Sequence, residues 1–390
     1  MKKIFILIVV IFWLFYPAKS IASNNISNTQ IDSNQIISTQ KDSVNISKFI
    51  QEAKKYTEDV YKDVDYNELL NNAILGKIDN EKIGKNILSL IGKETMSSIY
   101  TIVAIMVIII VHSILKSISE GLENKSISQI SYYIQYILIV TLIMSNFAEI
   151  ITVTKESISD LVAFSNTLVP VLITLVLTTG NVISANLLQP ILLFTITFIG
   201  NFIYDVIIPV LLASTALGIV SKISERIQLD KLSKFFKSST VWILGIVLTL
   251  FVSLVSVEGS LSSSVDGITA KTAKAAVSSF IPVVGKILGD AVDTVIGCAS
   301  ILKNAVGIVG VIVIIGICIK PIIKLLTIMA TYYIGAAICE PIADGKIVKL
   351  LEQMGDTFKI LLAILCSLSV MLIIGTTLVM KISNSGLMYR

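Results

Sequence analysis

Two aspartates head the few residues of this chain that could do chemistry inside a membrane. Asp205 follows Tyr204 and Asp290 follows Gly289, which superficially resembles an aspartyl intramembrane protease, where two carboxylates share one proton. Ile287, however, stands two positions before Gly289, where that class of protease has a glycine. An aspartyl protease therefore stays an alternative hypothesis.

Other catalytic and cofactor sites lack their residues. The one histidine is His112. The sequence has no G-x-S-x-G motif that would supply a nucleophilic serine beside it. One histidine with no cysteine pair at ligand spacing is too few ligands for a metal site. Gly285-Lys286 is followed by Ile287 and lacks the upstream glycine of a P-loop. We predict no catalytic residue, no cofactor and no metal, and hence that the chain is not an enzyme. The sparse basic residues, nearly all lysine, argue against nucleic-acid binding.

The apolar composition predicts the kind of structural element that carries these candidate residues. Hydrophobic residues make up 54% of the 390 residues, charged residues 15%, and the mean hydropathy is +0.85, whereas soluble chains carry roughly 25% charge. We predict an all-α, polytopic membrane protein with about seven to nine transmembrane helices. The expected spans are 99–115, 130–151, 161–179, 187–204, 206–220, 240–257, 305–320, 322–340 and 360–380.

The N-terminal part is expected to be exported. Residues 1–22 form a signal peptide, with Lys2 and Lys3 before a short apolar segment and cleavage after Ala22; an uncleaved first span is the alternative. Residues 23–46 are predicted to be a disordered polar linker. Residues 47–95 show helical periodicity and are predicted to form a small extracytoplasmic helical region. The four cysteines are expected to be buried hydrophobes.

Prolines and charge predict how the spans are arranged. Prolines break the long apolar runs 187–220 and 305–340, so we expect each run to hold two short spans, or one span and a re-entrant piece. Segment 221–239 is the most basic loop and is placed in the cytoplasm, whereas 344–359 is balanced and is placed outside. Residues 96–257 and 305–390 then form two bundles, with a possible inverted repeat. Chance recurrence of short hairpins is the alternative.

The segment 258–304 between the two bundles is predicted to be amphipathic or re-entrant. Its glycines form a stripe that permits close helix contact, and its charges lie on one face. The segment either dips toward the membrane, lining a polar path or docking a partner, or lies flat on the outer interface. The candidate packing or path-lining residues are Pro282, Gly285, Lys286, Gly289, Asp290, Asp293, Gly297, Lys303 and Asn304.

Four charged residues lie in or beside predicted spans, namely Asp205, Lys320, Lys324 and Glu340. Charges inside a membrane are unfavourable and often functional, but all four fall near predicted span ends, where such side chains reach the interface. Interfacial anchoring and a transport role both remain open. Asp205 is the candidate intramembrane polar residue.

The 278–307 block carries a family resemblance. Residues 278–286 (SSFIPVVGK), 290–297 (DAVDTVIG) and 302–307 (LKNAVG), with the upstream run 266–274 (DGITAKTAK), resemble the stage III sporulation protein AE family of endospore-forming bacteria. The order of parts, a signal peptide followed by a short polar region and many spans, also fits. The similarity covers about residues 95–380.

The resemblance implies a role. Members of this family belong to a set of mother-cell membrane proteins, which includes a separate ATPase. With a forespore membrane protein, that set is implied to form a channel or secretion-like complex needed for endospore formation. The expected localisation is the mother-cell membrane around the forespore, multi-pass, with the mature N-terminus outside the cytoplasm. A small-solute secondary transporter built on the inverted repeat is the alternative function.

Overall fold

The computed structural model describes residues 46–76 with gaps at 59 and 62–63, then 125–223, 229–280, 284–343 and 345–382, with isolated positions at 37 and between 92 and 114. Within these ranges, side chains are not described for residues 125–129, 131, 132, 135, 223, 258–280 and 284–293. The predicted signal peptide, the cleavage after Ala22, nearly all of the linker 23–46 and His112 lie outside the described residues. Most of the predicted span 99–115 is described, and its described positions are helical.

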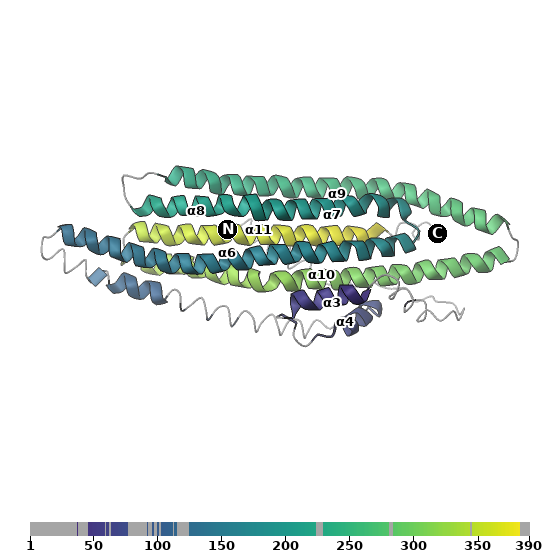
Figure 1. The fold of residues 1–390 in the computed structure, drawn as a ribbon, viewed down its shortest axis with the longest axis horizontal. Coiled ribbons are helices and arrows are strands. Elements are labelled where there is room, and N and C mark those ends of the chain that lie inside the picture. The colour runs from purple at the N-terminus through teal and green to yellow at the C-terminus, as the bar shows by residue number, and fades with distance from the viewer. Residues whose placement is uncertain are drawn as a thin grey trace. The chain divides into compact units, whose positions relative to one another are not determined.

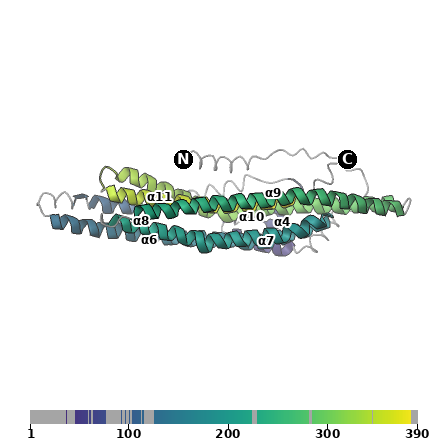
Figure 2. The same cartoon turned by 90° about the horizontal axis from the view of Figure 1, so that it is seen from above.

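Every element in the described part of the chain is helical. The helices are α3 (Ile46–Thr57), α4 (Tyr66–Ile74), α6 (Lys125–Thr178), α7 (Val182–Phe202), the π-helix η1 (Ile203–Ile207), α8 (Ile208–Ile223), α9 (Asp230–Phe280), α10 (Val284–Cys339) and α11 (Gly345–Lys381). Figure 1 shows α6 to α11 running alongside one another, and Figure 2 shows the same helices from above. Their buried apolar faces form one core.

Five helical stretches are long and apolar enough to cross a membrane, which confirms the all-α, polytopic class. They cover Tyr136–Thr178, Val182–Lys222, Asp230–Val257, Thr294–Cys339 and Gly345–Lys381. A span needs only about 20 residues, so the stretches of 43, 41 and 46 residues are each about twice that length. Parts of these helices therefore extend beyond the hydrocarbon core or tilt strongly within it.

The predicted count of seven to nine spans is too high for the described residues, because charges and prolines were taken as breaks. Pro170, Pro190 and Pro321 all lie inside continuous helices. Membrane helices tolerate proline because neighbouring helices and hydroxyl side chains bond the backbone groups that it leaves free.

The two charged connectors lie at the same end of the bundle, so the inverted repeat is wrong. Lys237 Nζ donates to the Gln353 carbonyl oxygen at 2.9 Å, and the Thr215 and Thr357 hydroxyls lie 3.3 Å apart. The first turns of α9 and α11 are therefore on one side, as Figure 1 shows for the ends at which these two helices begin. The prediction placed them apart because it folded 305–340 into two spans, whereas α10 passes through once.

Helices α3 and α4 lie within the predicted helical region 47–95 and pack on the side of the bundle, whereas residues 77–95, except position 92, lie outside the described residues. Residues 66–74 are helical, and Gly76 ends this turn with φ +69°, a left-handed conformation that suits glycine. The Phe49 ring lies 5.9 Å from the Phe164 ring of α6. Burial raises the pKa of Tyr66, whose hydroxyl is hydrogen-bonded to that of Thr57. Whether this region is extracytoplasmic stays a prediction.

Candidate functional site: a polar face on α6 and α7

Asp205 lies inside a π-helical turn in the middle of a long helix. The turn Ile203–Ile207 joins α7 to α8, and the Ile208 N–H donates to the Ile203 carbonyl oxygen five residues earlier. Pro209 explains the wide turn, because it has no N–H to offer the Asp205 carbonyl oxygen four residues before it, and its ring would clash with that carbonyl in an α-helix. The prediction that Asp205 lies near a span end is therefore wrong. Asp205 lies about midway along the membrane-length stretch Val182–Lys222.

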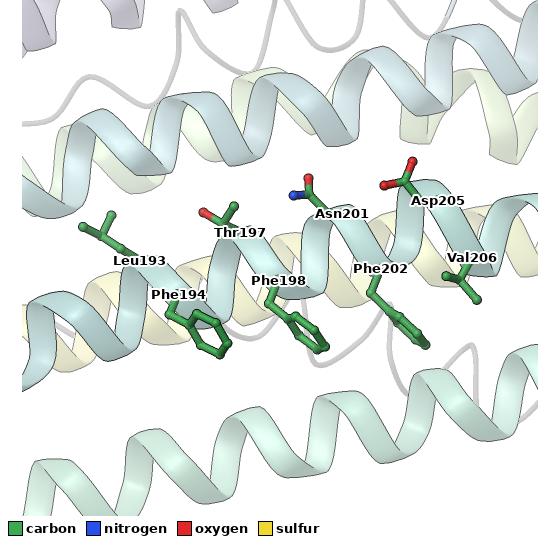
Figure 3. A pocket seen from close by; sticks show the side chains of 8 residues that line it. All are labelled: Leu193, Phe194, Thr197, Phe198, Asn201, Phe202, Asp205 and Val206. Atoms are coloured by element: carbon green, nitrogen blue, oxygen red, sulfur yellow. The ribbon is translucent and has the colours of Figure 1, made fainter.

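The side chains around this turn separate into a polar row and an aromatic row (Figure 3). Thr197, Asn201 and Asp205 project from one side at steps of four residues, and Asn201 and Asp205 are exposed. Phe194, Phe198 and Phe202 project from the other side, with successive ring centroids 5.8 and 6.2 Å apart. Both rows line a groove of about 620 Å³. The exposed rings suit lipid and the exposed carboxylate does not.

The polar row faces α6. The Thr197 hydroxyl donates to Asn166 Oδ1 of α6 at 3.3 Å. About two turns along α7 from Thr197, the Lys155 ammonium group lies 4.4 Å from the centroid of the Tyr204 ring, a cation–π distance. Asn166 is exposed and Lys155 is partly exposed. The polar side of the π-helical segment thus continues onto α6.

The exposed surface of α6 is itself polar, and we call it the α6 polar face. Its exposed polar residues recur at steps of three, four or seven residues and are Thr141, Ser145, Glu149, Thr152, Glu156, Ser159 and Asn166. Glu149 forms an ion pair of 2.5 Å with Lys324 of α10, and its side chain is 61% exposed. A second carboxylate, that of Glu156, is exposed two turns further along the helix. Two ionisable groups thus lie on the open side of a helix otherwise apolar enough to span a membrane.

The sequence prediction missed the α6 polar face because it split this helix. Lys155, Glu156 and Asp160 indicated a loop between spans 130–151 and 161–179, whereas the structure is helical throughout. The signal that could have found it is the helical spacing of polar residues, which runs unbroken through the supposed loop. A true loop would not have preserved that spacing.

Only part of the predicted 258–304 site falls on described side chains. Pro282 lies outside the described residues, and the side chains of Gly285, Lys286, Gly289, Asp290 and Asp293 are not described. Lys303 is fully buried, and its Nζ donates to the Met380 carbonyl oxygen at 2.6 Å, where a cation complements the C-terminus of α11. Asn304 is partly buried. A Cβ added to Gly297 would meet no atom within 4 Å, so this glycine makes no close helix contact here.

The described residues bring together no group that would hold a metal, since they contain no cluster of three or more His, Cys, Asp and Glu side chains. The four cysteines, Cys298, Cys318, Cys339 and Cys366, are free and buried. That burial confirms the prediction that they act as hydrophobes. The arrangement supports solvation and binding of polar groups along one side of the bundle, rather than a reaction at one point.

Comparison with known families decides the broader identity. The family described as stage III sporulation protein AE matches residues 64–383. The chain belongs to this family. The matched region extends from just before α4 to the end of α11, so it contains the residues of the α6 polar face and Asp205. Membership confirms the resemblance in the 278–307 block and indicates a role in sporulation.

One curated relative supports the assignment. The stage III sporulation protein AE of Bacillus subtilis (strain 168) is 29% identical over 277 residues, which cover 71% of this chain and 69% of the relative. No solved structure matches.

Proposed function

We propose that this chain is a non-enzymatic, integral membrane component of a channel or secretion-like complex that joins mother cell and forespore during endospore formation. Family membership supports the sporulation role. The observation that carries the channel role is structural: the five membrane-length helices leave one side polar, with Glu149 and Glu156 exposed. A membrane protein that worked alone and faced lipid on every side would not expose carboxylates there.

The proposal includes location and partners. The chain resides in the mother-cell membrane around the forespore, crosses it several times, and has its mature N-terminus outside the cytoplasm. Its partners are other mother-cell membrane proteins of the same complex, including a separate ATPase that supplies energy, and indirectly a forespore membrane protein. The bilayer solvates the apolar helices.

Deletion tests the proposed function. We expect an in-frame deletion to stop development after engulfment, with loss of a late forespore reporter and of heat-resistant spores, and we expect the full chain to restore both. A tagged full chain should co-purify with membrane proteins that depend on the same developmental stage. Normal spore yield in the deletion strain would contradict the proposal.

A small-solute transporter is the second candidate, and Asp205 favours it. A carboxylate in a π-turn at the middle of a membrane-length helix is a suitable group for coupling an ion to transport. The corrected topology removes the inverted repeat as support. Uptake by vesicles that contain only the purified chain, abolished by Asp205→Asn, would favour the transporter over the channel component.

A further inference from the structure

Contacts between helices set the relative heights of α6 and α9. Ser214 of α8 and Ser233 of α9 exchange side-chain-to-carbonyl hydrogen bonds of 2.6 and 2.7 Å. Lys155 of α6 lies beside Tyr204, and Tyr204 is about 15 Å along the helix from Ser214. The same advance from Ser233 reaches Ile243, so residues 240–247 of α9 lie at about the height of residues 152–159 of α6.

At that shared height the two helices expose opposite chemistry. On α9, Val241, Trp242 and Ile246 are 52%, 70% and 38% exposed. On α6, the exposed residues are Thr152, Glu156 and Ser159. Residues 238–257 of α9 contain no charged side chain. The bundle therefore has an apolar side and a polar side at one depth.

Hydroxyl groups alone would not distinguish the two sides, but carboxylates do. Thr152 of α6 and Thr249 of α9 are both exposed, and each hydroxyl donates to the carbonyl oxygen four residues earlier, at 3.0 and 2.8 Å. A threonine bonded in this way is compatible with lipid. An ionised carboxylate has no proton to donate to a backbone carbonyl oxygen of its own helix. Exposure of Glu156 and Asp205 to hydrocarbon would therefore be strongly unfavourable.

We propose that the α6 polar face, from Glu149 to Ser159, together with Asp205, lines a water-filled path through the membrane. The proposal rests on the chain being part of a channel complex, and it names the wall that this chain contributes. The wall is α6 with the π-helical segment, and path-lining by the 258–304 segment stays a separate prediction. The exposed face of α9 borders lipid.

Cysteine accessibility tests the proposed wall, and the native cysteines do not interfere because all four are buried. Thr152→Cys and Ser159→Cys report on α6, and Thr249→Cys is the matched control on α9. Membranes from sporulating cells that carry the full chain are sonicated, so that a charged, membrane-impermeant methanethiosulfonate reaches both sides. We expect the α6 cysteines to react at least about tenfold faster than the control, because the reactive thiolate is suppressed in apolar surroundings.

Three results would overturn the proposal. Equally slow reaction at all three positions would mean that lipid or a partner protein covers α6. Equally fast reaction would mean that this height lies outside the membrane, and faster reaction on α9 would reverse the assignment. Variants are scored only if they sporulate normally. Because all three substitutions are conservative, we expect the chain to fold with each of them. Normal spore yield after deletion would reject the channel role without changing the reactivities, so the two failures are distinguishable.

Discussion

Helices α6 and α9 run in the same direction through one bundle, yet their exposed sides differ in chemistry. Both are apolar enough to span a membrane, but the most apolar part of α9 is only 22% buried and that of α6 is 61% buried. The helix that hides more of its surface exposes Glu149 and Glu156, and the helix that hides less exposes Trp242 and Leu250. Mean hydropathy therefore identifies both helices as membrane helices but does not reveal which surroundings each side meets.

A new carboxylate on the exposed side of α9 should remove the difference between the two helices, and we expect this substitution to have the largest effect of those proposed. Leu250 is 58% exposed on α9, and Leu250→Glu places a carboxylate where we expect lipid, which costs about 3 kcal/mol near the centre of a span. We expect little of this variant in the membrane fraction on an immunoblot.

Thr152→Glu on α6 is the matched variant, because it adds the same carboxylate to the polar face. We expect its level in the membrane fraction to equal that of the unmodified chain. Equal loss of both variants would show that α6 and α9 meet the same surroundings.

Two glycines compare a covered side of the bundle with an open one. A Cβ on Gly316 of α10 would lie 2.6 Å from a ring carbon of Tyr61, beneath α3 and α4, whereas a Cβ on Gly245 of α9 would meet nothing within 4 Å. Gly316→Leu should destabilise the packing of the N-terminal helices by about 1–3 kcal/mol. The measurement is the protease concentration that cleaves within residues 46–76 of the folded chain.

Gly245→Leu is the control for that experiment. Both substitutions gain the same helix propensity, so the difference between them isolates the contact with Tyr61. We expect no change in cleavage with Gly245→Leu. A similar change with both variants would argue that α3 and α4 do not pack against α10.

The ion pair between Glu149 and Lys324 tests whether the exposed side of α6 is in contact with water. We expect the smallest effect here. Because Glu149 is 61% exposed, a double-mutant cycle with Glu149→Gln and Lys324→Met should give a coupling energy below about 1 kcal/mol. The coupling should weaken further as salt screens it. A coupling of several kcal/mol that salt does not change would place the pair in a dry interface instead.

The helical, membrane-spanning fold class could be predicted from the sequence, because apolar runs and helical periodicity are local signals. The helical periodicity of α3 and α4 and the glycine at position 76 are local signals in the same way, and both helices lie within the predicted helical region. Connectivity was harder. Pro321 ends a helix in water but not among packed membrane helices, so one error inside α10 reversed the predicted side of 344–359.

The candidate site was only partly predictable for a related reason. Asp205 stood out as an acid in an apolar run, but its exposure depends on the π-turn that Pro209 causes. Lys303 looked like a path-lining lysine from its own helix, whereas its partner is the Met380 carbonyl 77 residues away. Which side of α6 remains open depends on how α7, α10 and α11 pack, and no local pattern contains that information.

The most direct test of the central difference is the surroundings of one spin label on each helix. Labels attached to Thr152→Cys and Thr249→Cys of the full chain in membranes are compared by their collision rates with oxygen, which concentrates in lipid, and with a water-soluble nickel chelate. The α6 label should collide mainly with the nickel chelate, and the α9 label mainly with oxygen. The same preference for oxygen at both positions would contradict a water-facing α6.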